Sequence, residues 1–91
     1  MIGSFRHKGL EEIWRTGKSH RIGADQVRKC IRILQMLELA VQPEDMNISG
    51  LRFHGLQGNP KRWSVRVSAN YRITFGWPGD SAIDIDLEDY H

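Results

Sequence analysis

The last four residues of the chain, Glu88-Asp89-Tyr90-His91, bring together carboxylates, a phenol and an imidazole. Imidazole takes up and releases a proton near neutral pH, so a terminal His91 that docks onto the fold is a candidate general base. The alternative is a solvated chain end, which is how most termini behave. The rest of the sequence has to distinguish between these two interpretations.

Length and composition limit the fold to one domain spanning residues 1–91, because 91 residues with 40% hydrophobic content can form a single modest core. The most apolar stretch, residues 31–41, is too short and polar to cross a bilayer, and residues 1–6 lack a signal-peptide pattern, so we expect a cytoplasmic protein. The single cysteine, Cys30, lies in an apolar helical stretch and is expected to be a buried core residue rather than a nucleophile.

The charges are unevenly distributed along the chain. All 13 Lys and Arg precede residue 80 and outweigh the six acids there by seven, whereas residues 80–91 hold five acids and no Lys or Arg. A basic body suits a polyanion such as RNA. The alternative is an ordinary solvated charged surface.

Hydrophobic periodicity predicts helices in the first half of the chain. Residues 1–6 are compatible with a short strand, and residues 8–16 form a short helix that Gly17 stops. From residue 24 to about 41, apolar residues recur at helical spacing and predict the longest helix, ended by Pro43. Its predicted apolar stripe consists of Val27, Cys30, Ile31, Leu34, Leu37 and Val41. Residues 42–50 are expected to be a loop or a single helical turn.

The period changes to two in the second half. Residues 63–67, 71–75 and 83–88 alternate apolar and polar side chains and are joined by turn-forming residues, which predicts an antiparallel meander. The long helix should cover the apolar face of this sheet. Arg66 and Arg72 belong to the opposite, open face, where we expect the functional site. The predicted fold class is therefore α+β, with N-terminal helices packed on one face of a small antiparallel sheet.

Four segments together give the chain a family resemblance. They are residues 5–10 (FRHKGL), 51–59 (LRFHGLQGN) and 69–75 (ANYRITF), and the terminal EDYH of residues 88–91. In this combination the chain resembles the HigB toxins of the RelE superfamily, which belong to bacterial type II toxin-antitoxin systems. The resemblance covers essentially the whole chain and implies a RelE-like fold. It departs from some relatives at Gln57, where they carry a basic residue, and at His54, which some lack.

The resemblance implies a ribosome-dependent endoribonuclease that cleaves messenger RNA without a metal ion or other cofactor. His91 would be the general base, Asp89 would orient the tail or the ribose, and Tyr90 would stack on a base. His54 would donate a proton to the phosphate or the leaving oxygen, and Arg72 would hold the phosphate. Each residue also has a structural alternative: His54 as a backbone cap, Arg72 as the partner of Asp84 or Asp86, and Tyr90 as an edge-packing aromatic.

A basic run with an interleaved aromatic residue is a second candidate for RNA or ribosome contact. It consists of Lys61, Arg62, Trp63 and Arg66, and the alternative is again a solvated charged face. His7 and His20 stand apart from the other histidines without ligand spacing, so no metal site is predicted.

The implied partners are messenger RNA on the ribosome and a helix-turn-helix antitoxin of the HigA type, bound against the first two helices, with the toxin alone a monomer. Two other functions remain open. One is a non-catalytic RNA- or ribosome-binding module neutralised by an antitoxin, and the other is a partner of an antitoxin with no RNA role. Codon preference cannot be deduced from the sequence.

Overall fold

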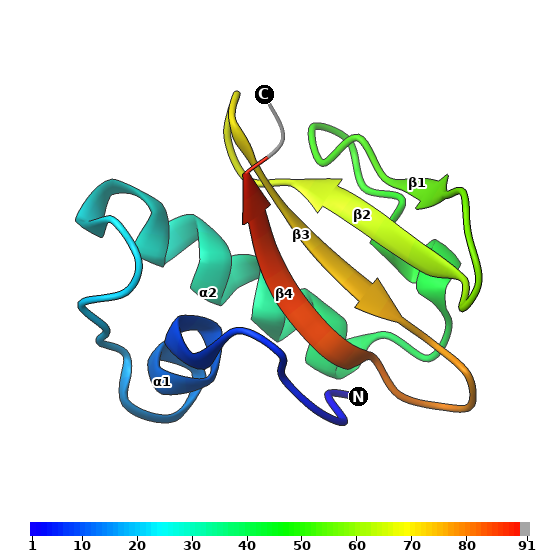
Figure 1. Ribbon diagram of the computed structural model, residues 1–91, viewed down its shortest axis with the longest axis horizontal. Helices are drawn as coiled ribbons and strands as arrows, with labels where there is room; N and C mark the ends of the chain where they lie inside the picture. The colour runs from blue at the N-terminus through cyan, green and yellow to red at the C-terminus, as the bar shows by residue number, and fades with distance from the viewer. Residues whose placement is uncertain (90–91) are drawn as a thin grey trace.

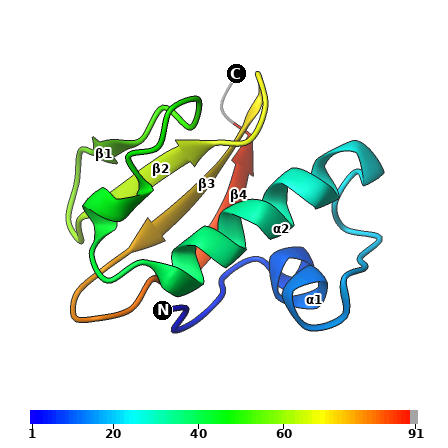
Figure 2. The ribbon, with the colours of Figure 1, turned by 180° about the vertical axis from the view of Figure 1, so that it is seen from behind.

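A computed structural model describes residues 1–89, which form two helices followed by a four-stranded antiparallel sheet. The helices are α1 (Lys8–Thr16) and α2 (Ala24–Leu39), and a single 3-10 turn, η1 (Pro43–Met46), leads toward the sheet. In Figure 1 the sheet lies in front and α2 passes behind it, and Figure 2 shows α2 from its own side. The predicted α+β arrangement, with helices on one face of an antiparallel sheet, is confirmed.

Local sequence explains where the helices begin and end. The Nδ1 atom of His7 accepts a hydrogen bond from the backbone N–H of Leu10 and so caps the start of α1. Gly17 ends α1 in a left-handed conformation (φ 81°), which glycine adopts without steric cost. In α2, Cys30, Ile33, Leu34 and Leu37 form the buried stripe. None of the helices within residues 1–89 has the length and apolar character needed to cross a membrane.

The sheet has the strand order β1-β2-β3-β4 and every pairing is antiparallel. Its strands are β1 (His54–Leu56), β2 (Arg62–Arg66), β3 (Tyr71–Gly76) and β4 (Ile83–Asp89). On the helix side, Val65, Ile73, Phe75 and Ile85 are buried in one core with residues of α1 and α2. Because strand side chains alternate, Ser64, Arg66, Arg72 and Thr74 belong to the opposite, open face.

Two predictions about the chain's edges were wrong. Residues 1–6 form no strand and make only two isolated parallel bridges, Ile2 with Ala82 and Phe5 with Ile85. Backbone hydrogen bonds join the two segments, among them one from the Gly3 N–H to the Ala82 carbonyl, and the hydroxyl of Ser4 accepts a further one from the backbone N–H of Asp84. The strand β1 was not predicted, because His-Gly-Leu has no alternating apolar pattern and acquires its structure by pairing with β2.

The long helix ends two residues earlier than expected. Ala40 has an extended backbone (φ −68°, ψ 143°), so the helical period stops before Val41, which is 77% exposed. The backbone N–H of Val41 instead donates to the Asp45 carboxylate, which keeps the pKa of Asp45 below its ordinary value. Val41 is therefore not part of the core stripe.

The register between β3 and β4 shifts between Thr74 and Gly76. Asp84, opposite this shift, has φ 50°, a left-handed conformation that is uncommon for a residue with a side chain. The shift matters for the open face, because it directs the carbonyl of Asp84 toward the side chain of Arg62.

Candidate functional site

A cleft on the open face brings together residues from β1, β2, β3 and the segment before β1. It is lined by Arg52, His54, Ser64, Arg66 and Arg72 and has a volume of about 300 Å³. Three of these five side chains are guanidinium groups and one is an imidazole. The structure thus places three of the predicted site residues, His54, Arg66 and Arg72, around one cavity.

Hydrogen bonds on both sides orient the imidazole of His54. Its Nδ1 lies 3.0 Å from the carbonyl oxygen of Arg52, and its Nε2 lies 3.3 Å from the hydroxyl of Ser64. Because a carbonyl oxygen only accepts hydrogen bonds, the contact with Arg52 requires a hydrogen on Nδ1, and Nε2 is the ring nitrogen directed at the Ser64 hydroxyl. The side chain is exposed, so this atom is accessible to a ligand.

The backbone before β1 fixes this geometry. Arg52 has a left-handed conformation (φ 49°), and the N–H of Arg66 donates to the carbonyl of Leu51 at 2.6 Å. The loop is thereby attached to β2, and the Arg52 carbonyl is presented to His54. His54 therefore makes the predicted hydrogen bond to local backbone and also lines the cleft.

Arg72 is paired across the sheet, although not with the acids named from the sequence. Its guanidinium NH2 lies 3.5 Å from the carboxylate Oε1 of Glu88, the residue directly opposite on β4, so the predicted pairing with Asp84 or Asp86 is corrected to Glu88. The sequence could not resolve this because the irregularity between β3 and β4 changes which acid lies opposite which residue. Three-quarters of the Arg72 side chain and two-thirds of the Glu88 side chain are buried.

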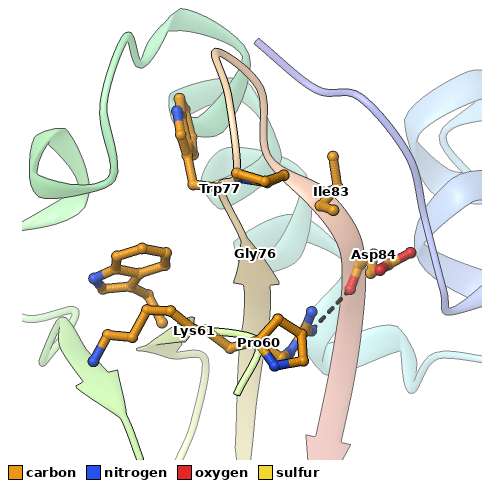
Figure 3. A pocket seen from close by; sticks show the side chains of 9 residues that line it. Pro60, Lys61, Gly76, Trp77, Ile83 and Asp84 are labelled. Carbon is orange, nitrogen blue, oxygen red and sulfur yellow. Dashed lines mark hydrogen bonds between the residues drawn. The ribbon is translucent and has the colours of Figure 1, made fainter. Parts of the chain in front are cut away.

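The carboxylate of Glu88 is itself held by a buried hydroxyl. Thr74, which has no exposed surface, donates to Oε2 of Glu88 and accepts a hydrogen bond from NH2 of Arg62 at 2.9 Å. The same nitrogen of Arg62 donates to the carbonyl of Asp84 at 2.8 Å (Figure 3). A continuous chain of contacts thus runs across the open face from Arg62 through Thr74 and Glu88 to Arg72.

Burial lowers the pKa of Arg62, and the nearby positive charge of Arg6 lowers it further, while Glu88, Asp84 and Asp86 act in the opposite direction. The guanidinium remains charged, since arginine starts from a very high pKa. Arg62 therefore has a structural function on the open face in addition to its predicted role in RNA binding.

The other predicted residues lie outside the cleft. Lys61 and Trp63 lie at the opposite end of β2, where the ammonium of Lys61 is 5.7 Å from the centre of the Trp63 ring. Asp89 ends β4 and pairs with Tyr71, one position beyond the pair of Arg72 and Glu88. Tyr90 and His91 lie outside the described residues.

The sequence reasoning missed Arg52, Ser64, Thr74 and Glu88. Ser64 alternates with Arg66 along β2, so strand periodicity alone was sufficient to place it on the open face. Arg52 had no such signal, because it precedes a strand that the pattern did not reveal.

The cleft can bind a phosphate and deliver a proton to it. Two or three guanidinium groups supply positive charge and paired donors for phosphate oxygens, and an oriented imidazole can serve as a general acid. Among residues 1–89, no group of three or more His, Cys, Asp and Glu side chains is placed to hold a metal ion.

Comparison with known proteins agrees with this description. The pattern of the HigB-like toxins, described as the RelE-like toxin of type II toxin-antitoxin system HigB, matches residues 3–91. The protein called Endoribonuclease HigB from Proteus vulgaris is 35% identical over 92 residues, covering 100% of both chains. Toxin HigB-1 of Vibrio cholerae serotype O1 is 34% identical over 91 residues, covering 97% of this chain and 96% of its own.

The two helices and the four-stranded antiparallel sheet are consistent with a RelE-like toxin domain. The chain belongs to the HigB-like family, the toxins of a type II toxin-antitoxin system. The resemblance drawn from its sequence motifs is confirmed.

Proposed function

We propose that this toxin is an endoribonuclease that cleaves messenger RNA on the ribosome and thereby stops translation and growth. Two observations support the proposal. A relative that aligns over its full length is named an endoribonuclease. The open face of this chain gathers His54, Arg66 and Arg72 around one cavity suited to a phosphate.

The reaction is the attack of a ribose 2′-oxygen on the adjacent phosphorus, without a metal ion. A base removes the proton of the 2′-hydroxyl, the bond from phosphorus to the 5′-oxygen breaks, and an acid protonates the departing oxygen. The products are a 2′,3′-cyclic phosphate and a free 5′-hydroxyl. Arg72 and Arg66 stabilise the negative charge that develops on the phosphorane, because charge-assisted donors act strongly in a partly buried cleft.

His54 is the proton donor in this scheme. Its Nδ1 is held by the Arg52 carbonyl, and its Nε2 lies 3.3 Å from the hydroxyl of Ser64 in the cleft. A protonated Nε2 can hydrogen-bond to the phosphate and then give its proton to the leaving oxygen.

His91 is the general base. It follows the last described residue, Asp89, by two positions, a distance of at most about 7 Å along an extended chain. Asp89 is the last residue of β4, and Glu88, directly before it in the same strand, contacts Arg72. This proximity of the end of β4 to the arginine of the cleft is the observation that carries the proposal. Asp89 orients the tail or the ribose, and Tyr90 stacks on a base.

Contacts outside the cleft hold the RNA or the ribosome. Lys61, Arg62 and Trp63 supply these contacts, and Arg66, which lines the cleft, adds a further positive charge. Basic residues with an aromatic ring are usual in the binding of single-stranded RNA. The antitoxin is a helix-turn-helix protein of the HigA type that binds α1 and α2, on the far side of the sheet from the cleft, and blocks ribosome entry. The toxin alone is a cytoplasmic monomer.

Induced expression of the chain in bacterial cells without an antitoxin tests the proposal. The wild-type protein should arrest growth and produce messenger RNA fragments, whereas Arg72→Ala should lose both effects at equal protein levels. Lys18→Ala, an exposed charge change between the two helices, is the matched control and should remain toxic. Growth arrest with intact messenger RNA would overturn the nuclease and favour a protein that only binds RNA or the ribosome.

A further inference from the structure

A second cavity opens at the end of the sheet opposite to the cleft. It lies where β2 starts, β3 ends and β4 starts, and has a volume of about 130 Å³. Its lining includes Trp63, Trp77, Pro60 and Arg62. Figure 3 shows Trp77 and Ile83 on one side of the cavity and Lys61 and Pro60 on the other. This cavity is distinct from the cleft, because the two share no lining residue.

Two of the residues that line the cavity are tryptophans, and both pack against the core. Trp63 lies opposite Phe75 on the neighbouring strand, with ring centres 6.3 Å apart and an interplanar angle of 21°. Trp77 packs edge-on against the same ring, with centres 6.3 Å apart and an angle of 70°. Phe75 is completely buried, whereas both tryptophans are only partly buried. The core therefore holds two indole rings in place while each retains accessible surface.

Positive charge lies beside these rings. The exposed Lys61 extends its ammonium over the Trp63 ring, and the Arg62 guanidinium forms another wall of the cavity. The carboxylate of Asp84, which also lines the cavity, lies 3.9 Å from the guanidinium of Arg6, so its charge is partly balanced. Because Trp63 is nearly parallel to Phe75 and Trp77 is edge-on to it, the two indoles are inclined to each other and present one face and one edge. Aromatic surface of this kind with cations beside it matches a nucleobase attached to a phosphate backbone better than it matches an aliphatic side chain.

A glycine keeps the cavity open. A Cβ atom added at Gly76 would lie 3.4 Å from the side chain of Ile83 and 3.8 Å from NH1 of Arg62, both of which line the cavity. These are ordinary contact distances, so alanine fits at this position but occupies part of the space. The absence of a side chain here leaves room for a ligand.

One strand joins the cavity to the cleft. Arg62 and Trp63 line the cavity, and Ser64 and Arg66 of the same strand line the cleft. Arg62 and Arg66 are four residues apart, which corresponds to about 13 Å along a strand. Trp63 lies opposite Phe75, so its indole belongs to the helix side of the sheet, whereas Arg62 and the cleft belong to the open face. An RNA strand that follows the open face and bends around the end of the sheet where β2 begins can reach both places.

We propose that the cavity lined by Trp63 and Trp77 binds an unpaired nucleobase of the RNA substrate, a few nucleotides from the cleaved bond. This inference rests on the proposed nuclease function and adds a subsite to it. The base stacks on one indole ring and meets the other at an angle, and Lys61 contacts the adjoining phosphate.

Tryptophan fluorescence tests the subsite directly. In a Trp14→Phe background, Trp63 and Trp77 are the remaining tryptophans, and a short 2′-O-methyl RNA oligonucleotide, which cannot be cleaved by 2′-oxygen attack, should quench them. An oligonucleotide with the same phosphates and no bases should bind about tenfold more weakly and cause little quenching. Equal binding and quenching by the two oligonucleotides would overturn the subsite.

Two substitutions probe the same space in different ways. Gly76→Val fills the cavity and should raise KM for messenger RNA on programmed ribosomes several-fold with little change in kcat. Trp77→Leu removes an indole ring and should raise KM to a similar extent. Gly76→Ala should have a smaller effect, and Lys18→Ala should have none. An unchanged KM in folded Gly76→Val would contradict the inference.

Quenching and cleavage measured together distinguish failure of the subsite from failure of the nuclease proposal. Wild-type cleavage combined with no quenching would reject the subsite alone, whereas quenching without any cleavage would reject the nuclease alone. Protection of the indoles by the purified antitoxin, with no quenching by RNA, would assign the cavity to a protein partner and overturn the inference.

Discussion

Arg72 and Glu88 face each other directly across β3 and β4, and their charged groups are 3.5 Å apart on the open face of the sheet. The carboxylate of Glu88 is held from the other side by the buried Thr74. The guanidinium that is expected to bind the RNA phosphate therefore has an anionic partner in the free protein. A phosphate has to bind beside this carboxylate or displace it from Arg72.

Glu88→Gln removes this negative charge and retains a similar side-chain shape. We expect it to bind a 2′-O-methyl RNA oligonucleotide about fivefold more tightly at low salt, corresponding to ~1 kcal/mol for a partly exposed pair. Fluorescence anisotropy titrations at low and high salt would measure the change. Asp80→Asn makes the same charge change at an exposed turn and is the control. Equal gains in both variants would show that only the net charge matters, and weaker binding by Glu88→Gln would show that Glu88 supports Arg72 instead of competing for it.

Arg62 should contribute to stability more than its predicted role in RNA contact suggests. It donates to Thr74 and to the Asp84 carbonyl, so Arg62→Ala leaves a partly buried acceptor without its partner and should cost about 1–3 kcal/mol of unfolding free energy. Urea unfolding followed by circular dichroism would measure this loss. Lys61→Ala, its exposed neighbour, should leave the midpoint nearly unchanged. A loss of equal size in both variants would contradict the structural role of Arg62.

Cys30 gives the folded state a specific pH dependence. Burial raises the pKa of its thiol from 9.0 to about 11, so the folded protein retains the thiol proton at pH values where the unfolded chain releases it. Stability from this group is complete below pH 9 and decreases as the pH rises from 9 toward 11. Urea unfolding at pH 7.5 and about pH 10 should show a loss of roughly 1 kcal/mol that is absent in Cys30→Ala. Identical pH slopes in the two proteins would contradict this prediction.

Periodicity was sufficient to predict both helices and three of the four strands, because each buries one regular face. It failed where structure depends on a partner: His54–Leu56 becomes a strand only against β2, and residues 1–6 pair with residues 82–85 only through two isolated bridges. Val41 was misplaced because an apolar residue after a helix end still fits the period.

Those site residues whose positions follow the alternation of side chains along a strand could be predicted from the sequence. Arg66 and Arg72 were placed on the open face by their positions in β2 and β3, and His54 by the family motif. The pairing of Arg72 with Glu88 depends on the register shift near Asp84, which no sequence pattern reveals. Arg52 lines the cleft because its backbone is left-handed, and Trp77 lines the second cavity because it follows the end of β3. Neither placement is visible in the sequence pattern.

The most direct test of the nuclease proposal is cleavage of a defined messenger RNA on purified ribosomes, with the new ends identified chemically. We predict one cut in the ribosomal A site that leaves a 2′,3′-cyclic phosphate and a 5′-hydroxyl with no added metal requirement beyond that of the ribosome. His91→Ala and His54→Ala should each slow the cut by about a hundredfold or more while ribosome binding is retained. Full-rate cleavage by either variant, or ends carrying a 5′-phosphate, would contradict the proposed chemistry.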